Sequence, residues 1–153
     1  MDNLALSEKT VAVVNWMIEL ERKCAKTFDK LANAAFTPEL AKALHPEQTY
    51  IQNHYQRLKL ITKLLPKGKA LIASAIVINP IKFSKNKSNE QDVELIFIAN
   101  QFLAMKNNQY ELLINLFKLL AQDEAITLLR QTITDNENTQ IWINRTLIQL
   151  VEN

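Results

Sequence analysis

Residues that form turns are scarce in this sequence, which has one glycine and four prolines among 153 residues. Tight hairpins depend on glycine, so this scarcity argues against a fold of many short strands. The only cysteine is Cys24, which excludes an internal disulfide. The length suits a single domain with one sizeable core, and we expect residues 1–153 to form it.

Long hydrophobic runs are also missing. The longest apolar run, Ala70 to Ile78, is interrupted by Ser74 and is too short to span a bilayer. The first six residues lack the basic and then apolar stretches of a signal peptide. We therefore expect a cytoplasmic protein that does not associate with membranes.

Acidic residues are absent between Gln48 and Asn89, although the net charge of the chain is only +2. Such an interval can attract an acidic partner, but it also suits a solvated helix end and loop. Apart from Phe83, no aromatic residue alternates with its lysines, so nucleic acid is not an expected partner. The basic residues of this stretch are Arg57, Lys59, Lys63, Lys67, Lys69, Lys82, Lys85 and Lys87.

Apolar residues recur at alternating spacings of three and four in four long segments, which predicts four amphipathic helices. Ser7 is a good N-cap for the first helix. Thr37-Pro38-Glu39 has the features of a helix start, so the first two helices should form an antiparallel hairpin. Pro46 predicts a kink or break near residues 44–45, with regular helix then continuing to about Leu65.

A second hairpin is expected in the last third of the chain. One helix should run from about Gln91 to Ala121, and another should follow Gln122-Asp123. The stretch before this hairpin is ambiguous between a helix and a strand. We favour a short helix over Ala70–Ile78, because a lone strand would have no partner. The expected fold is an all-α four-helix bundle whose long crossover contains this short helix.

Polar residues interrupt the apolar face of each predicted helix. Glu47 and His54, for example, share the face that carries Ile51 and Leu58. Buried titratable groups must be paired, neutralised or bound to a metal ion. Heights counted from the turns, at about 1.5 Å per residue, predict a common polar core near mid-bundle. Its expected members are Glu21, Tyr50, His54, Asn107, Asn136 and Gln140, with Glu111 close by.

These features resemble the YciE-like branch of the ferritin-like superfamily, which comprises small bacterial proteins of unknown function. The resemblance covers most of the chain and depends on the order and spacing of several short motifs. They are Glu21, FTPEL at 36–40, His54 followed by YQRL at 55–58, the YE pair at 110–111, and Trp142 after the polar centre of the last helix. It implies a ferritin-like bundle in which carboxylates and histidine hold one or two metal ions.

Carried over position by position, the resemblance implies metal ligands at Glu21, His54 and Glu111, for iron, manganese or zinc. Tyr50 and Asn136 stand where two further carboxylates belong, and the residues that flank Asn136, Asp135 and Glu137, should point away. A di-iron centre uses about four carboxylates and two histidines, so the set is incomplete. Two interpretations remain open. Either these ligands hold one metal ion, or Glu21 pairs with His54 in a polar core completed by amides.

Three functions follow from these interpretations. The first is a non-enzymatic structural or stress-associated module with a degenerate metal site. The second is a metal-binding protein with oxidase or peroxide-related activity, and the third is an adaptor that binds an acidic partner through Lys59–Lys87. We find no phosphate-binding glycine loop and no nucleophile with a base, so we expect no catalytic or cofactor-binding residues and leave enzymatic activity open. Broad apolar faces on the first and third helices favour a homodimer.

Overall fold

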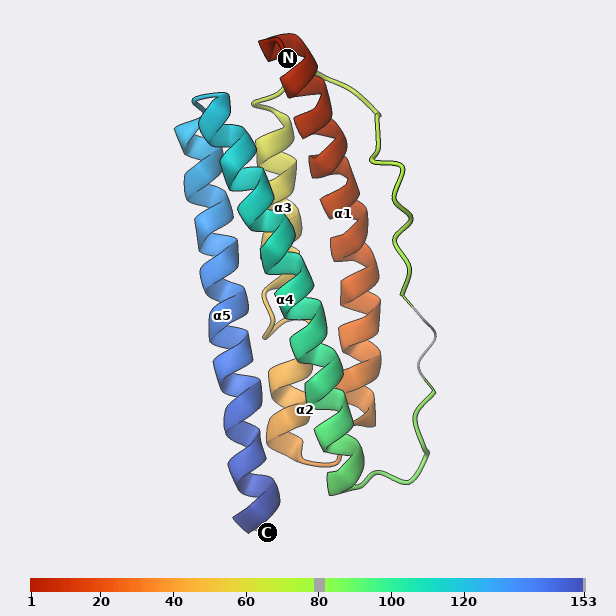
Figure 1. Cartoon of the computed structure of the whole chain (residues 1–153). Helices are drawn as coiled ribbons and strands as arrows, with labels where there is room; N and C mark the ends of the chain where they lie inside the picture. Colours follow the sequence, from red (N-terminus) through yellow and green to blue (C-terminus); the bar gives the residue numbers. More distant parts are fainter. Residues whose placement is uncertain (79–81, 153) are drawn as a thin grey trace.

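The computed structural model describes residues 1–78 and 82–152, and within them all regular secondary structure is α-helical. The helices are α1 (Asn3–Ala34), α2 (Pro38–Leu44), α3 (Ile51–Thr62), α4 (Asn89–Leu119) and α5 (Asp123–Glu152). α1 runs antiparallel to the α2–α3 pair, and α4 runs antiparallel to α5 (Figure 1). The expected all-α bundle of two hairpins is confirmed. No helix in these two ranges is long and apolar enough to cross a membrane.

The second long helix is divided at the position that Pro46 predicts. α2 ends at Leu44, and α3 begins only at Ile51, after a left-handed residue, Tyr50, with φ 57°. Because the turn between them takes up several residues, the helical spacing that should place Tyr50 in the core does not apply. Tyr50 is 44% exposed, so its expected place in the polar core is wrong.

The first helix begins earlier than expected. Asp2 is its N-cap, and the Asp2 carboxylate accepts a hydrogen bond from the Ala5 backbone N–H at 2.7 Å. The predicted start at Ser7 is therefore wrong, since an equally good capping residue lies upstream and lets one more turn form. α4 begins after Ser88, whose hydroxyl accepts from the Gln91 N–H at 3.2 Å, close to the expected start.

The crossover between α3 and α4 contains no helix in its described residues, so the short helix expected over Ala70–Ile78 is wrong. The segment instead runs along the outside of α1 (Figure 1). Side chains of α1 donate to its backbone carbonyl oxygens: Asn15 to Gly68 and Ala70 at 3.1 and 3.0 Å, Trp16 to Ser74 at 2.8 Å, and Lys23 to Ile76 at 3.2 Å. These bonds satisfy carbonyl groups that a helix would have satisfied internally.

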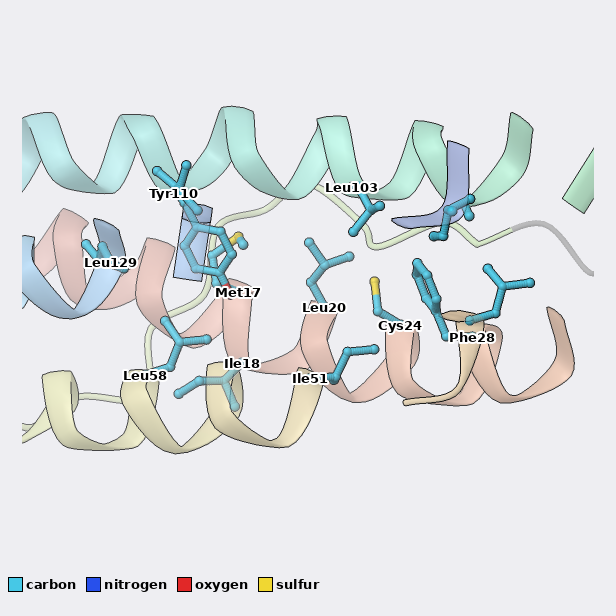
Figure 2. Packing of buried hydrophobic residues seen from close by; sticks show 14 of the residues in the cluster. Met17, Ile18, Leu20, Cys24, Phe28, Ile51, Leu58, Leu103, Tyr110 and Leu129 are labelled. Atoms are coloured by element: carbon cyan, nitrogen blue, oxygen red, sulfur yellow. The ribbon is translucent and has the colours of Figure 1, made fainter. Parts of the chain in front are cut away.

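The hydrophobic core lies along the bundle axis and receives buried side chains from all five helices. Figure 2 shows Leu20, Cys24 and Phe28 following one another along α1 toward α4. All three are at most 1% exposed, and Tyr110 of α4 is fully buried near Met17. Leu20, Cys24 and Phe28 follow one another at intervals of four residues, about one helical turn, so they share one face of α1.

Asp92 joins the start of α4 to the turn between α1 and α2. Its two carboxylate oxygens accept hydrogen bonds from the backbone N–H groups of Phe36 and Thr37, at 2.7 and 2.9 Å. Asp92 is fully buried, and these donors lie in the turn just before Pro38, the first residue of α2. The carboxylate therefore fixes the relative position of the two hairpins.

Candidate functional site

A buried ion pair between α1 and α4 lies at the centre of the bundle. Lys106 Nζ is 3.0 Å from Glu21 Oε1, and the two side chains are 1% and 0% exposed. The Tyr110 hydroxyl, one turn further along α4, donates to the same carboxylate oxygen at 2.9 Å. Both groups approach Glu21 because positions 106 and 110 share a helix face.

His54 of α3 completes the inner part of this cluster. Its Nδ1 is 3.3 Å from Lys106 Nζ and 3.6 Å from Glu21 Oε2, and the ring is fully buried. Nδ1 therefore lies between a donor, the Lys106 ammonium, and an acceptor, the Glu21 carboxylate, and which of the two it binds depends on the tautomer of the ring. Nε2 lies 3.3 Å from Asp135 Oδ2 of α5, although without the geometry of a hydrogen bond.

Asp135 connects the cluster to the surface. Its Oδ2 is 2.6 Å from Arg57 Nη1, and the two side chains are 20% and 18% exposed. Arg57 also donates to the Thr132 hydroxyl at 3.2 Å. The expectation that Asp135 points away from the core is therefore wrong, whereas Glu137 is exposed as expected. Arg57, counted with the basic interval in the sequence, belongs to this ion pair.

The electrostatics of the cluster favour an ionised Glu21. Burial alone would raise the pKa of this carboxyl, but the Lys106 ammonium and the nearby His54 ring hold its pKa below 4.5. Burial, together with the adjacent Glu21 charge, raises the pKa of Tyr110 well above its ordinary value. For Asp135, His54 and Arg57 outweigh partial burial and lower the pKa of the carboxyl.

The amides predicted for the polar core are brought together in part. Asn136 Nδ2 of α5 donates to Asn107 Oδ1 of α4 at 2.8 Å, and Asn136 is fully buried. Gln140 is half-buried, and no hydrogen bond from its side chain is among those of the described residues. Of the residues expected in the polar core, Glu21 thus lies beside His54, and Asn107 beside Asn136.

Glu111 lies apart from the cluster. Its side chain is exposed on the outer face of α4, so the structure does not bring it to Glu21 and His54. Tyr110, the other half of the YE pair, takes the inward position instead. Within residues 1–78 and 82–152 there is no group of three or more His, Cys, Asp and Glu side chains arranged to hold a metal ion.

The remaining donor set does not fit a metal ion either. The Nδ1 of His54 and the Oε1 of Glu21 both face the Lys106 ammonium, which already supplies a positive charge. Glu21 Oε2 is buried without a hydrogen-bond partner among the described residues. That acceptor suits a water molecule, because a second cation there would be repelled by the ammonium nearby.

Cys24 lies one turn from Glu21 on the buried face of α1. Burial raises the pKa of its thiol to about 12. A protonated thiol is a poor nucleophile and a poor metal ligand, so Cys24 serves as a small apolar side chain.

Lys106 was not among the residues predicted from the sequence, although a signal was present. The predicted stripe of this helix passed through Asn107, with Leu103, Tyr110 and Phe117. A stripe through Lys106 shares those three apolar positions and has the fully buried Leu95, Ala99 and Leu113 where the predicted stripe has Ile96, Asn100 and Ile114. The greater apolar content of the second stripe favours Lys106 as the inward residue.

Residues 13–153 match the family described as Domain of unknown function (DUF892), and the chain belongs to this family. Its structure is similar to the crystal structure of the E. coli stress protein YciF, with a TM-score of 0.77 and 18% sequence identity over 97% of this chain and 98% of that chain. At this identity the likeness concerns the fold alone, and it agrees with the all-α helical bundle described above. A search of curated proteins found no match.

Proposed function

We propose that this protein is a non-enzymatic, stress-associated structural module of the cytoplasm, from the YciE-like branch of the ferritin-like superfamily. In this proposal its mid-bundle metal site is degenerate, and Lys106 supplies the positive charge that a metal ion would otherwise supply. Glu21, His54 and Asp135 then act as a polar framework that fixes how the four helices meet.

One observation carries the proposal. The Lys106 ammonium is 3.0 Å from Glu21 Oε1 and 3.3 Å from His54 Nδ1, and all three side chains are buried. A lysine inside the cluster neutralises its carboxylate without any ion from solution. The alternative function, a protein that binds iron, manganese or zinc for oxidase or peroxide chemistry, needs those same two ligand atoms to be available.

Metal analysis separates the two functions. The protein would be purified without chelator and incubated anaerobically with iron(II), manganese(II) or zinc(II), beside His54→Gln as a control, and bound metal would be measured by elemental analysis. We expect far less than one metal ion per chain in every sample, with no difference between the proteins. About one ion per native chain, lost in His54→Gln, would refute a degenerate site and support the metal-binding alternative.

The stress association is supported only by the likeness to a stress protein, so it needs a test in cells. We expect the abundance of this protein to rise when the producing cells meet high salt or peroxide, measured by quantitative immunoblot against a constitutive protein. Unchanged abundance under each stress would leave a structural module with no stress role.

We also propose that the protein forms a homodimer through α4 and α5. Asn100 of α4 donates to Asn144 of α5 at 2.9 Å, which fixes these two helix faces side by side. Near this bond, at helical spacing, lie exposed apolar side chains: Val93 (50%), Phe97 (64%), Ile141 (50%) and Ile148 (60%). Light scattering should give a dimer mass for the native chain and a monomer mass for a Phe97→Ser/Ile148→Ser variant. A native monomer would refute this arrangement.

A further inference from the structure

A cavity of about 520 Å³ lies between α1, the end of α3 and the beginning of the crossover. This volume is in the range of pockets that bind small molecules. It lies apart from the mid-bundle cluster, and its lining residues include neither Glu21 nor His54. Its chemistry is therefore independent of the function proposed above.

The floor of the cavity is apolar. Val11, Val14 and Ile18 of α1 line it and succeed one another on one helix face. Leu65 and Pro66, just after α3, add an apolar wall. Such a surface favours the hydrocarbon part of a ligand, which would leave water on binding.

The rim of the cavity is strongly basic. Lys59, Lys63, Lys67 and Lys69 all line it, and its lining residues include no carboxylate. Within the described residues, none of these four ammonium groups lies in an ion pair with an acidic side chain. An apolar floor beneath four lysines is complementary to a molecule with a hydrocarbon chain and one anionic head.

The wall formed by the crossover is fixed in place. Asn15 Nδ2 donates to both Gly68 O and Ala70 O, at 3.1 and 3.0 Å, and so ties this part of the chain to α1. A Cβ atom at Gly68 would meet only Val11 Cγ1, at 3.5 Å, which is an ordinary van der Waals contact. A larger side chain at position 68 can therefore be introduced to fill the cavity without straining the backbone.

We propose that this cavity binds a medium-chain fatty acid, with the alkyl chain against Val11, Val14 and Ile18 and the carboxylate among the rim lysines. The carboxylate exchanges its water for ammonium donors, and the alkyl chain fills the cavity against Val11, Val14 and Ile18, which are at most 8% exposed. A neutral alcohol of the same chain length lacks the first interaction, and a short carboxylate lacks the second.

Isothermal titration calorimetry with decanoate, below the concentration at which it forms micelles, tests the proposal. We expect decanoate to bind in saturable fashion, and decanol and acetate to bind more weakly by about tenfold or more. Gly68→Phe should abolish decanoate binding, whereas Asn86→Phe, on an exposed part of the crossover outside the cavity, should leave it unchanged. Circular dichroism would establish that both variants fold as the native chain does.

A charge-matched pair of variants identifies the head-group interaction. Lys63→Glu/Lys67→Glu should weaken decanoate binding by about tenfold or more, while Lys85→Glu/Lys87→Glu, with the same change in net charge, should not. If both variants lost decanoate binding equally, and the native chain bound an acidic peptide as tightly as decanoate, the lysines would form an adaptor surface over Lys59–Lys87. That result would overturn the proposal. Absence of decanoate binding, or equal binding of decanol, would also overturn it.

Discussion

The Lys106–Glu21 ion pair allows one perturbation whose size can be worked out from the structure. Lys106→Met keeps a side chain of similar length but removes the ammonium 3.0 Å from Glu21 Oε1. The Glu21 carboxylate then remains fully buried with the Tyr110 hydroxyl as its hydrogen-bond donor. Removing one partner of a buried ion pair costs about 3–5 kcal/mol, which is a large part of the roughly 5–15 kcal/mol that stabilises an ordinary domain.

A double-mutant cycle isolates the interaction. Glu21→Gln should be costly in the same way, because it leaves the ammonium without a counter-charge. The double variant, Glu21→Gln/Lys106→Met, contains no buried charge at this pair and should lose only about 1–2 kcal/mol relative to the native chain. Urea unfolding at pH 7, followed by circular dichroism, gives these free energies of unfolding.

A matched control and two contrary outcomes complete this prediction. Lys118→Met, an exposed position on the same helix, should change the unfolding free energy by less than about 0.5 kcal/mol. If Lys106→Met also stayed within about 1 kcal/mol of the native chain, the pair would not be buried as described. If the double variant lost the sum of the two single losses, the two side chains would not interact.

Three further predictions concern other buried groups. The lowered pKa values of Glu21 and Asp135 stabilise the fold near neutral pH, so the free energy of unfolding from urea titrations should fall as pH drops below their ordinary values of 4.5 and 3.8, and a flat profile would contradict this. Cys24, with a thiol pKa of about 12, should react with Ellman's reagent quickly in urea but only slowly in the native protein, and rapid native labelling would show that it is accessible. Asp92→Ala should lower the unfolding free energy by about 2–4 kcal/mol, because it leaves two backbone N–H groups without acceptors, whereas a loss below about 1 kcal/mol would show that the turn does not depend on Asp92.

Helix periodicity was sufficient to predict the arrangement of the bundle. The spacing of apolar residues gave the four long segments, and Pro46 gave the break between α2 and α3. Counting both helices from one turn also placed His54 and Glu21 in one band near the middle of the bundle. Tyr50 failed that count, since the turn after Pro46 removes residues from the helix.

The crossover and Lys106 depended on interactions that local patterns do not contain. Residues 70–78 are not helical, because Asn15, Trp16 and Lys23 of α1 donate hydrogen bonds to carbonyl oxygens of this segment. These donors are more than 50 residues away in the sequence. Lys106 is buried because Glu21 neutralises it from another helix. A lysine in isolation is expected at the surface, so its burial can be predicted only together with its partner.

The most direct test of a lysine at the centre of the bundle is the NMR signal of the Lys106 ammonium. Its hydrogens should exchange slowly with water, so a side-chain NH₃⁺ resonance should be visible at neutral pH and be absent in Lys106→Met. The account predicts that this resonance shifts or broadens in Glu21→Gln and does not change when zinc(II) is added. A signal lost to fast exchange, or one displaced by stoichiometric zinc(II), would contradict the conclusion that Lys106 occupies the position of a cation.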